Sequence, residues 1–290
     1  MDKFYVITNS EKDKDLETTR RIYDYLRKHG KTCTVREYQR KGAEPGTGDF
    51  RYTDEAWIPD GTECILVLGG DGTLIQAARD TVNRRIPLLG INLGTLGYLA
   101  EIEKAGVGDA LDSLMAEQYT IEPRMMLEGR VYRNGGETVQ DIALNDIVVN
   151  RAGDLRMIDY EISVNGESLN RYGADGMIVS TPTGSTGYSL SAGGPIVSPM
   201  ASMIVVTPIC PHTLAARSIV LSGEDRVTIR LGPGRRAQSE EAFASFDGGG
   251  SVSMATGDYV EIEKSEKTVN ILKISRISFL EVLRNKMHGN

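Results

Sequence analysis

No apolar run in this 290-residue sequence approaches the roughly 18 residues that a membrane-spanning helix requires, so we expect no membrane partner. The N-terminal stretch from Met1 to Val6 lacks the basic and apolar layout of a signal peptide. The cysteines are few, scattered and odd in number, at Cys33, Cys64 and Cys210, which argues against a disulfide framework. These absences predict a protein of the reducing cytoplasm.

Blocks of basic residues are also absent and the net charge is −7, so we expect no general nucleic-acid partner. The sequence has only three histidines, and the cluster Cys210-Pro211-His212 has no second ligand pair at zinc spacing. We therefore assign no metal site to the side chains. With 40% hydrophobic and 25% charged residues, the chain is typical of a globular protein with one large domain or two ordinary ones.

The common nucleotide-binding motifs are missing as well. No Gly-x-x-x-x-Gly-Lys-Ser/Thr sequence is present, which excludes a P-loop. The stretch from Gly70 to Ile75 lacks the third glycine of the dinucleotide fingerprint, which disfavours an ordinary Rossmann dehydrogenase. Gly184-Ser185-Thr186-Gly187 does not match the Gly-x-Ser-x-Gly elbow of α/β-hydrolases.

What the sequence does contain is a glycine turn, Gly69-Gly70-Asp71-Gly72-Thr73. It follows the apolar run 64–68, which has strand length, and precedes 74–79, which has the character of a helix start. Ligands of open α/β sheets bind beyond the carboxyl ends of strands, and the free N–H groups of a helix N-terminus suit phosphate. A lone carboxylate beside phosphates indicates phosphoryl transfer. The same residues are also consistent with a tight turn in which Asp71 is a helix N-cap.

Strand and helix patterns alternate over the first 120 residues, which predicts a Rossmann-like, doubly wound parallel sheet. A second glycine turn at 94–98 should lie at the same edge as the first, and a loop or lid is expected over 41–61. After Pro123, short β-rich runs, among them 139–149, 258–263 and 268–275, and a hairpin signal at Asn165-Gly166 predict an all-β sandwich. We therefore expect an α/β domain over 1–121 and a β-rich domain over 122–275, with 276–290 packing back on the first.

Polar residues mark two places in the β-rich part. Asn145 and Asp146 lie within the predicted strand 139–149, where they must face either a partner or a site, unless they form a β-bulge. The segment 175–195 leads from a strand into hydroxyl-bearing residues interleaved with glycines. Such groups recognise ribose, adenine and phosphate edges, although a Ser/Thr-rich loop would have the same composition.

These motifs together resemble the bacterial NAD kinase family over about residues 60–250. The resemblance is carried by Gly69-Gly70-Asp71-Gly72-Thr73, Leu144-Asn145-Asp146, Asp175-Gly176, the segment 180–195, Thr207-Pro208-Ile209-Cys210-Pro211-His212 and Phe246-Asp247-Gly248. Lipid kinases and phosphofructokinases share the glycine turn, whereas the segment 181–195 is highly specific.

The resemblance implies a role for each matching position. Asp71 would be the catalytic acid near the 2′-hydroxyl of the adenosine ribose, and Gly69, Gly70, Gly72 and Thr73 would bind the phosphates of ATP. The NAD-binding residues would be Asp71, Gly72, Asn145, Asp146, Arg156, Asp175, Thr186, Gly187, Tyr188, Ser189, Leu190 and Ser191. The family uses ATP or polyphosphate with a divalent metal such as Mg²⁺, here carried by the nucleotide phosphates, and assembles as homodimers or homotetramers.

Four positions depart from the family pattern. Asp146 replaces the usual Glu, Gly187 stands where Ala is common, Ser218 where Pro is common, and Gly249 where Gln is often found. None removes an expected carboxylate or hydroxyl from the centre of the site. The expected activity is phosphorylation of NAD to NADP, and the alternatives are a non-catalytic NAD or NADP sensor and a lipid kinase that shares the glycine turn.

Overall fold

The computed structural model describes residues 1–35, 51–94, 97–153, 157–213, 215–233, 241–275 and 277–287. The chain divides into two compact units. Unit 1 comprises the described residues within 1–42, 51–124 and 268–290, and unit 2 those within 125–267. The strands β6 (Thr120–Arg133) and β17 (Tyr259–Lys273) continue along the chain from one unit into the other.

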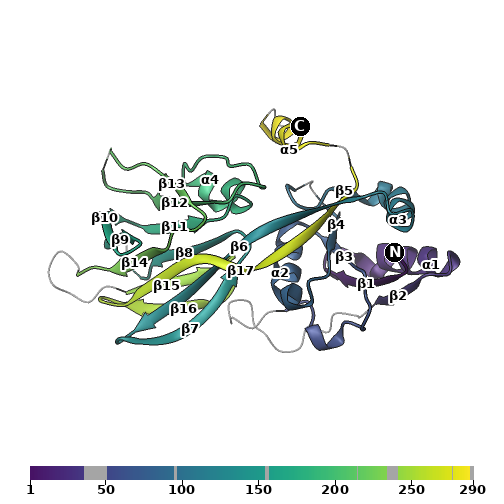
Figure 1. Ribbon diagram of the computed structural model, residues 1–290, viewed down its shortest axis with the longest axis horizontal. Helices are drawn as coiled ribbons and strands as arrows, with labels where there is room; N and C mark the ends of the chain where they lie inside the picture. The colour runs from purple at the N-terminus through teal and green to yellow at the C-terminus, as the bar shows by residue number, and fades with distance from the viewer. Residues whose placement is uncertain are drawn as a thin grey trace. The chain divides into compact units, whose positions relative to one another are not determined.

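Unit 1 alternates strands and helices. Its main elements are β1 (Lys3–Thr8), α1 (Glu17–Lys28), β2 (Thr32–Val35), β3 (Cys64–Gly69), α2 (Asp71–Thr81), β4 (Leu88–Asn92), β5 (Ile102–Glu103), α3 (Val107–Met115) and α5 (Phe279–Met287). The parallel strands follow the order β2-β1-β3-β4, and the last part of β17 pairs with β4. Figure 1 shows α1 and α3 on one face of this sheet and α2 on the other. The expected doubly wound sheet is confirmed.

The core of unit 1 follows from the sequence pattern of these elements. Ile22 and Leu26, one helical turn apart on α1, are fully buried in the same cluster as Leu66 and Leu68 of β3. Asp13 supplies the missing partners at the start of α1, because its carboxylate accepts hydrogen bonds from the N–H groups of Thr18 and Thr19, both at 2.9 Å. This helix therefore packs its apolar stripe on the sheet.

Unit 2 is built almost entirely of strands. They are β7 (Gly136–Ala143), β8 (Asp146–Arg151), β9 (Ile158–Val164), β10 (Glu167–Ala174), β11 (Gly176–Ser180), β12 (Met203–Ile209), β13 (Ile219–Ser222), β14 (Val227–Leu231), β15 (Glu241–Phe246) and β16 (Ser251–Ala255), with one short helix, α4 (Tyr188–Ser191). One sheet has the order β13-β12-β11-β8-β15-β16, and β10-β9-β14-β17 belong to a second sheet, which β17 continues into the strands of unit 1. Side chains from both fill a single core, which confirms the sandwich.

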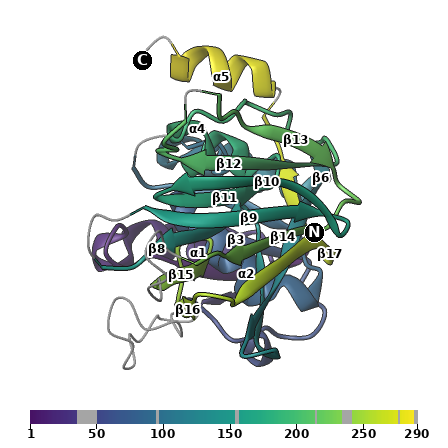
Figure 2. The same ribbon diagram turned by 90° about the vertical axis from the view of Figure 1, so that its left-hand side faces the viewer.

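The sequence patterns misplace several element boundaries in unit 2. The predicted strand 139–149 is two strands, β7 and β8, which break at Leu144 and Asn145. The runs 258–263 and 268–275 form the single strand β17. The hairpin predicted at Asn165-Gly166 is present, with both residues at positive φ, and its second strand, β10, was not predicted. Gly184–Thr186 form a 3-10 turn and Tyr188–Ser191 form α4, which lies beside β12 in Figure 2.

No helix among the described residues is long and apolar enough to cross a membrane.

Candidate active site

The glycine turn of unit 1 places Asp71 at the first residue of α2, with Gly70 as its N-cap. The Asp71 side chain does not cap its own helix. Its Oδ2 accepts a hydrogen bond from the N–H of Tyr98 at 2.7 Å, and its Oδ1 accepts from the N–H groups of Leu99 and Ala100, both at 3.1 Å. The N-cap interpretation of Asp71 is therefore wrong. Because β3 and β4 are parallel neighbours, the segments that follow them lie at the same edge of the sheet, as predicted.

These three amides use three of the four lone-pair directions of the Asp71 carboxylate and leave one, on Oδ2. The side chain is half-buried. Gly97 allows the close approach, because a Cβ at this position would overlap the Asp71 carboxylate. A carboxylate held rigidly by backbone amides, with one acceptor direction open, is suited to orient a ligand hydroxyl.

The residues around Asp71 form an N–H-rich surface at the start of α2. The N–H groups of Asp71 and Gly72 have no hydrogen-bond acceptor among the described residues. Nothing lies within 4 Å of a Cβ placed on Gly72, so the backbone there is open to a ligand. The positive end of the helix dipole adds to the attraction for an anion. Of the predicted phosphate-binding residues, Gly72 has an open N–H, whereas the Gly70 N–H donates to Thr73 Oγ1 and the Thr73 N–H donates to the Gly70 carbonyl.

In unit 2 the predicted pair Asn145 and Asp146 lies at a strand break held by Asp247. The Asp247 carboxylate accepts hydrogen bonds from the N–H groups of Leu144 at 2.7 Å, Asn145 at 2.7 Å and Asp146 at 3.1 Å. The expectation that both residues sit inside one strand is wrong, because these amides bond to a carboxylate instead of a neighbouring strand. Asp247 thus fixes the direction of the Asn145 and Asp146 side chains.

Asp146 has an environment opposite to that of Asp71. It is only 7% exposed. Burial and, to a smaller extent, the nearby charge of Asp247 raise the pKa of Asp146 to about 7. Its cross-strand partner on β11 is Ser180. The carboxyl group therefore takes up a proton near neutral pH and can change its hydrogen-bonding role with pH.

The segment after β11 packs directly on the strand break. The Thr181 N–H donates to the Asn145 carbonyl at 2.8 Å, and the Thr181 hydroxyl donates to the Leu144 carbonyl at 2.6 Å. Gly184 lies so close to the Asn145 backbone that a Cβ at this position would overlap it. Asn145 and the start of the segment 181–191 are thus brought together by backbone contacts.

Three polar atoms beside this contact are buried and have no hydrogen-bond partner in the described ranges. They are Asn145 Oδ1, Ser180 Oγ and Thr183 Oγ1. Buried polar groups are nearly always hydrogen-bonded in proteins, since each unsatisfied group costs roughly 1–3 kcal/mol. A polar ligand or bound water would satisfy them, which favours a binding site here over a simple Ser/Thr-rich loop.

The remaining predicted residues differ in how they are placed. The Asp175 carboxylate accepts a hydrogen bond from Arg151 Nε at 2.9 Å. The Ser189 hydroxyl is buried against the Thr207 hydroxyl at 3.0 Å, so it points into the protein. Half-buried or exposed positions are occupied by Thr186, Gly187, Tyr188, Leu190 and Ser191. Arg156 and residues 41–50 of the expected loop 41–61 lie outside the described residues.

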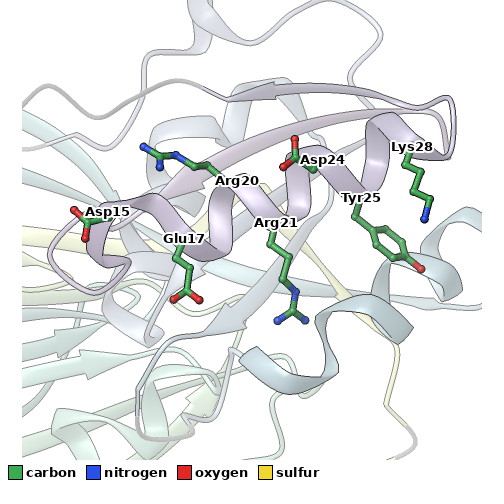
Figure 3. Close-up of a pocket in the computed structure, with 7 residues that line it drawn as sticks. All are labelled: Asp15, Glu17, Arg20, Arg21, Asp24, Tyr25 and Lys28. Atoms are coloured by element: carbon green, nitrogen blue, oxygen red, sulfur yellow. The ribbon is translucent and has the colours of Figure 1, made fainter.

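Other features of the surface do not add to this site. Cys210 and His212 are exposed. In the described part of the chain, no group of three or more His, Cys, Asp or Glu could hold a metal ion. A shallow hollow of about 600 Å³ runs along α1 (Figure 3), lined by Asp15, Glu17, Arg20, Arg21, Asp24, Tyr25 and Lys28. Its alternating acidic and basic side chains are typical of a solvated helix face.

Sequence reasoning gave no role to Asp247 or to the amides of residues 98–100. Asp247 belongs to a motif that carried the family resemblance, so that match was the available signal. Apart from the second glycine turn, nothing in the sequence indicated the amides of 98–100, because every residue except proline carries a backbone N–H group.

Comparisons with known proteins agree with this geometry. Residues 4–119 match the model of the ATP-NAD kinase N-terminal domain, and residues 144–274 match that of the C-terminal domain. The chain is 48% identical to the NAD kinase of Lachnospira eligens, across 99% of this chain and 100% of that protein. It is also 48% identical to the NAD kinase of Agathobacter rectalis, across 100% and 99% of the two chains.

Two solved structures have the same fold. A yeast NADH kinase complexed with NADH has a TM-score of 0.85 at 22% identity, covering 100% of this chain and 88% of that one. An NAD kinase from Archaeoglobus fulgidus in complex with ATP has a TM-score of 0.75 at 24% identity, covering 99% and 98%. The resemblance found in the motifs is confirmed, and the chain belongs to the ATP-NAD kinase family.

Proposed function

We propose that this protein transfers the γ-phosphoryl group of ATP to the 2′-hydroxyl of the adenosine ribose of NAD, giving NADP and ADP. The observation that carries the proposal is the Asp71 carboxylate, held by three amides beside the open N–H groups of α2. Membership of the ATP-NAD kinase family, and the archaeal relative described in complex with ATP, support the reaction and the donor.

Phosphoryl transfer depends mainly on alignment and on neutralisation of charge. The new bond joins the hydroxyl oxygen to the γ-phosphorus, and the bond from that phosphorus to the bridging oxygen breaks, so that ADP leaves. Asp71 either accepts the hydroxyl proton or orients the hydroxyl through the open direction of Oδ2. The phosphate-binding residues that we propose are Gly69, Gly70, Gly72 and Thr73, with the open N–H of Gly72 as a donor to a phosphate oxygen.

Residues of unit 2 bind the NAD. Asn145 Oδ1 and the hydroxyl of Thr183 are unsatisfied donors or acceptors that a ribose or adenine edge would complete. The NAD-binding residues that we propose are Asp71, Gly72, Asn145, Asp146, Arg156, Asp175, Thr186, Gly187, Tyr188, Ser189, Leu190 and Ser191. Ser189 would act through its backbone, since its hydroxyl is engaged with Thr207.

A divalent metal, Mg²⁺, would enter with the phosphates and offset their charge. The Asp71 carboxylate is already engaged by amides, so we assign the metal to the nucleotide phosphates. We further propose a cytoplasmic homodimer or homotetramer, in keeping with the scattered cysteines. Light scattering coupled to size exclusion would measure the oligomer.

Two rival functions make different predictions in one assay. Purified protein is incubated with ATP, Mg²⁺ and NAD, and NADP is read out with an NADP-specific dehydrogenase. NADP formation supports the kinase. Binding of NAD without NADP formation would instead indicate a non-catalytic sensor, and phosphorylation of a lipid would indicate a lipid kinase.

Replacement of Asp71 by Asn tests the catalytic role. We expect Asp71→Asn to lose most of its turnover, since the amide is a poor proton acceptor. It should also lose about 1–3 kcal/mol of stability, because an NH₂ group would face the Tyr98 N–H. Steady-state rates and urea unfolding measure the two effects.

The matched control is Asp13→Asn, which removes the same charge from a carboxylate that also accepts bonds from two backbone amides in unit 1. It should lose comparable stability while turnover is retained. Wild-type rates in Asp71→Asn, or an equal loss of turnover in the control, would reject the role of Asp71.

A further inference from the structure

The hydroxyl of Thr73 is constrained in a way that bears on phosphate binding. The side chain is only 4% exposed, at the start of α2. Its Oγ1 accepts hydrogen bonds from Asn9 Nδ2 at 3.3 Å and from the Gly70 N–H at 3.4 Å. A hydroxyl has two acceptor directions and one proton. Both acceptor directions are filled, and no acceptor for the proton lies within reach among the described residues.

The orientation of Asn9 is fixed by its own contacts. Asn9 follows β1, where its N–H donates to the Leu68 carbonyl at 2.9 Å. Its Oδ1 accepts from the Glu11 N–H at 3.1 Å, so the amide nitrogen must face the other way. That nitrogen donates one proton to Thr73 and the other to the Tyr52 hydroxyl oxygen at 3.1 Å. An inverted amide would lose the bond from the Glu11 N–H, because its nitrogen would then face another donor.

Tyr52 is in turn anchored to α2, the helix that carries Thr73. Asp80 is 6% exposed, and its Oδ2 accepts from the N–H groups of Tyr52 at 2.7 Å and Thr53 at 3.3 Å. The other oxygen of Asp80 accepts from Gln76 Nε2 at 2.8 Å. The chain of contacts from Asp80 through Tyr52 and Asn9 therefore begins and ends on one rigid helix.

We infer that Asn9 and Tyr52 are positioning residues that hold the Thr73 hydroxyl as a donor toward a phosphate oxygen of the phosphoryl donor. The inference rests on the proposed function, which assigns the glycine turn to ATP. Phosphate oxygens only accept hydrogen bonds, so a hydroxyl that is free to rotate would spend part of its time with a lone pair facing them. Filling both acceptor directions from within the protein removes that orientation and its cost.

The first test compares two variants, in each of which one tyrosine hydroxyl group is removed. Tyr52→Phe should lower kcat/KM for ATP by about three- to ten-fold, which is the effect of one hydrogen bond. KM for NAD should stay unchanged. The control is Tyr5→Phe, whose hydroxyl bonds Thr53 at 2.7 Å, next to Tyr52 in the chain. This control should leave both KM values unchanged. Equal changes in the kinetic constants for ATP in the two variants, or a change only in KM for NAD, would overturn the inference.

A double-mutant cycle then asks whether Tyr52 acts through Thr73. In a Thr73→Val background the hydroxyl is absent, so Tyr52→Phe should have no further effect on kcat/KM for ATP. Thr73→Ser, which keeps the hydroxyl, should restore the sensitivity to Tyr52→Phe. An undiminished effect of Tyr52→Phe in the Thr73→Val background would show that it acts by another route.

A second variant keeps the inference testable should Tyr52→Phe fold poorly. Asn9→Asp has the same shape, but the new carboxylate accepts only, so it would take the Thr73 proton and repel phosphate. It should weaken binding of ATP with Mg²⁺ by more than about ten-fold in calorimetry without NAD. If the wild type forms no NADP, the proposed function fails by itself. Unchanged ATP binding in Asn9→Asp would overturn the positioning role separately.

Discussion

The same residue type, aspartate, is held in two opposite ways in this protein. Asp71 and Asp247 each accept hydrogen bonds from three backbone amides. Asp146 lies beside Asp247, and burial raises its pKa to about 7. Burial beside a like charge favours the neutral form of a carboxyl group. Asp71 therefore serves as a hydrogen-bond acceptor held by the backbone, whereas Asp146 takes up a proton near neutral pH.

This difference predicts a pH-dependent stability at Asp146. Its pKa is raised from 3.8 to about 7, so below about pH 4 both folded and unfolded chains hold the proton. Between about pH 4 and 7 only the unfolded chain loses it, and stability falls by up to about 4 kcal/mol, then stays constant. The stabilisation by Asp146→Asn should therefore grow over that range. Urea unfolding at several pH values measures it.

The control for this experiment is Glu137→Gln, at an exposed position of β7 in the same unit. Its stability relative to the wild type should not vary over the same range. A gain in Asp146→Asn that is the same at about pH 5 and pH 8 would contradict the shifted pKa.

At the scale of elements, two glycines permit contacts on which the candidate site depends. Gly97 lets the 97–100 segment close on Asp71, and Gly184 lets the helical turn at Gly184–Thr186 press on Asn145. Neither has positive φ, so what each position requires is space and not an unusual backbone conformation. Two pairs of glycine-to-alanine substitutions test whether a lack of space for a side chain is the reason for each glycine.

Gly97→Ala should reduce both turnover and stability, because the new methyl group would displace the Asp71 carboxylate from its amides. We expect a loss of roughly 2–4 kcal/mol, since overpacking is combined with broken hydrogen bonds. Gly94→Ala in the same turn is the control, as nothing lies within 4 Å of its Cβ. Thermal unfolding and NADP formation report both effects, and equal behaviour of the two variants would refute this account.

Gly184→Ala should destabilise unit 2 by about 2 kcal/mol or more, because the methyl group would overlap the Asn145 backbone. Gly187→Ala is expected to be nearly neutral. Its Cβ would lie 3.3 Å from the Gly184 carbonyl oxygen and 3.6 Å from Asn145 Nδ2. Scanning calorimetry compares the melting temperatures of the two variants. Similar melting temperatures would mean that Gly184 is not sterically required.

On the scale of the whole chain, the C-terminal segment combines an essential strand with a dispensable helix. The last part of β17 buries Val269, Ile271 and Leu272 in unit 1. Glu101 then fixes its end, accepting hydrogen bonds from the Ile274 N–H at 2.6 Å and the Ser275 hydroxyl at 2.8 Å. In contrast, α5 has no buried residue.

Truncation after Ser275 should therefore leave the melting temperature within about 2 °C of the wild type, since little apolar area is lost. Truncation after Lys267 should prevent folding of unit 1, because it removes the buried side chains of β17. Differential scanning calorimetry of the two proteins makes the comparison. A large drop in melting temperature for the shorter deletion would show that α5 contributes to stability.

Much of the site was predictable because its chemistry lies in short stretches of sequence. The glycine turn at 69–73 follows a strand and opens a helix, and the segment 180–195 carries the family resemblance, so both are recognisable in the sequence. The roles of Asp71 and Asn145 stay predictions. The division of the chain at residue 121 and the role of Arg156 stay predictions. The parallel sheet and the β-sandwich were predicted from the spacing of apolar residues, because that spacing differs between helices and strands and shows which side of each is buried.

The sequence by itself determined the fold class, the family and the identity of the catalytic candidate. Only the tertiary structure decided what holds these residues. Asp71 is bound by amides 27, 28 and 29 positions away, and Asp247 by amides 101 to 103 positions away. Every residue except proline carries the same N–H group, so its position in space is fixed by the packing of elements and leaves no trace in residue type.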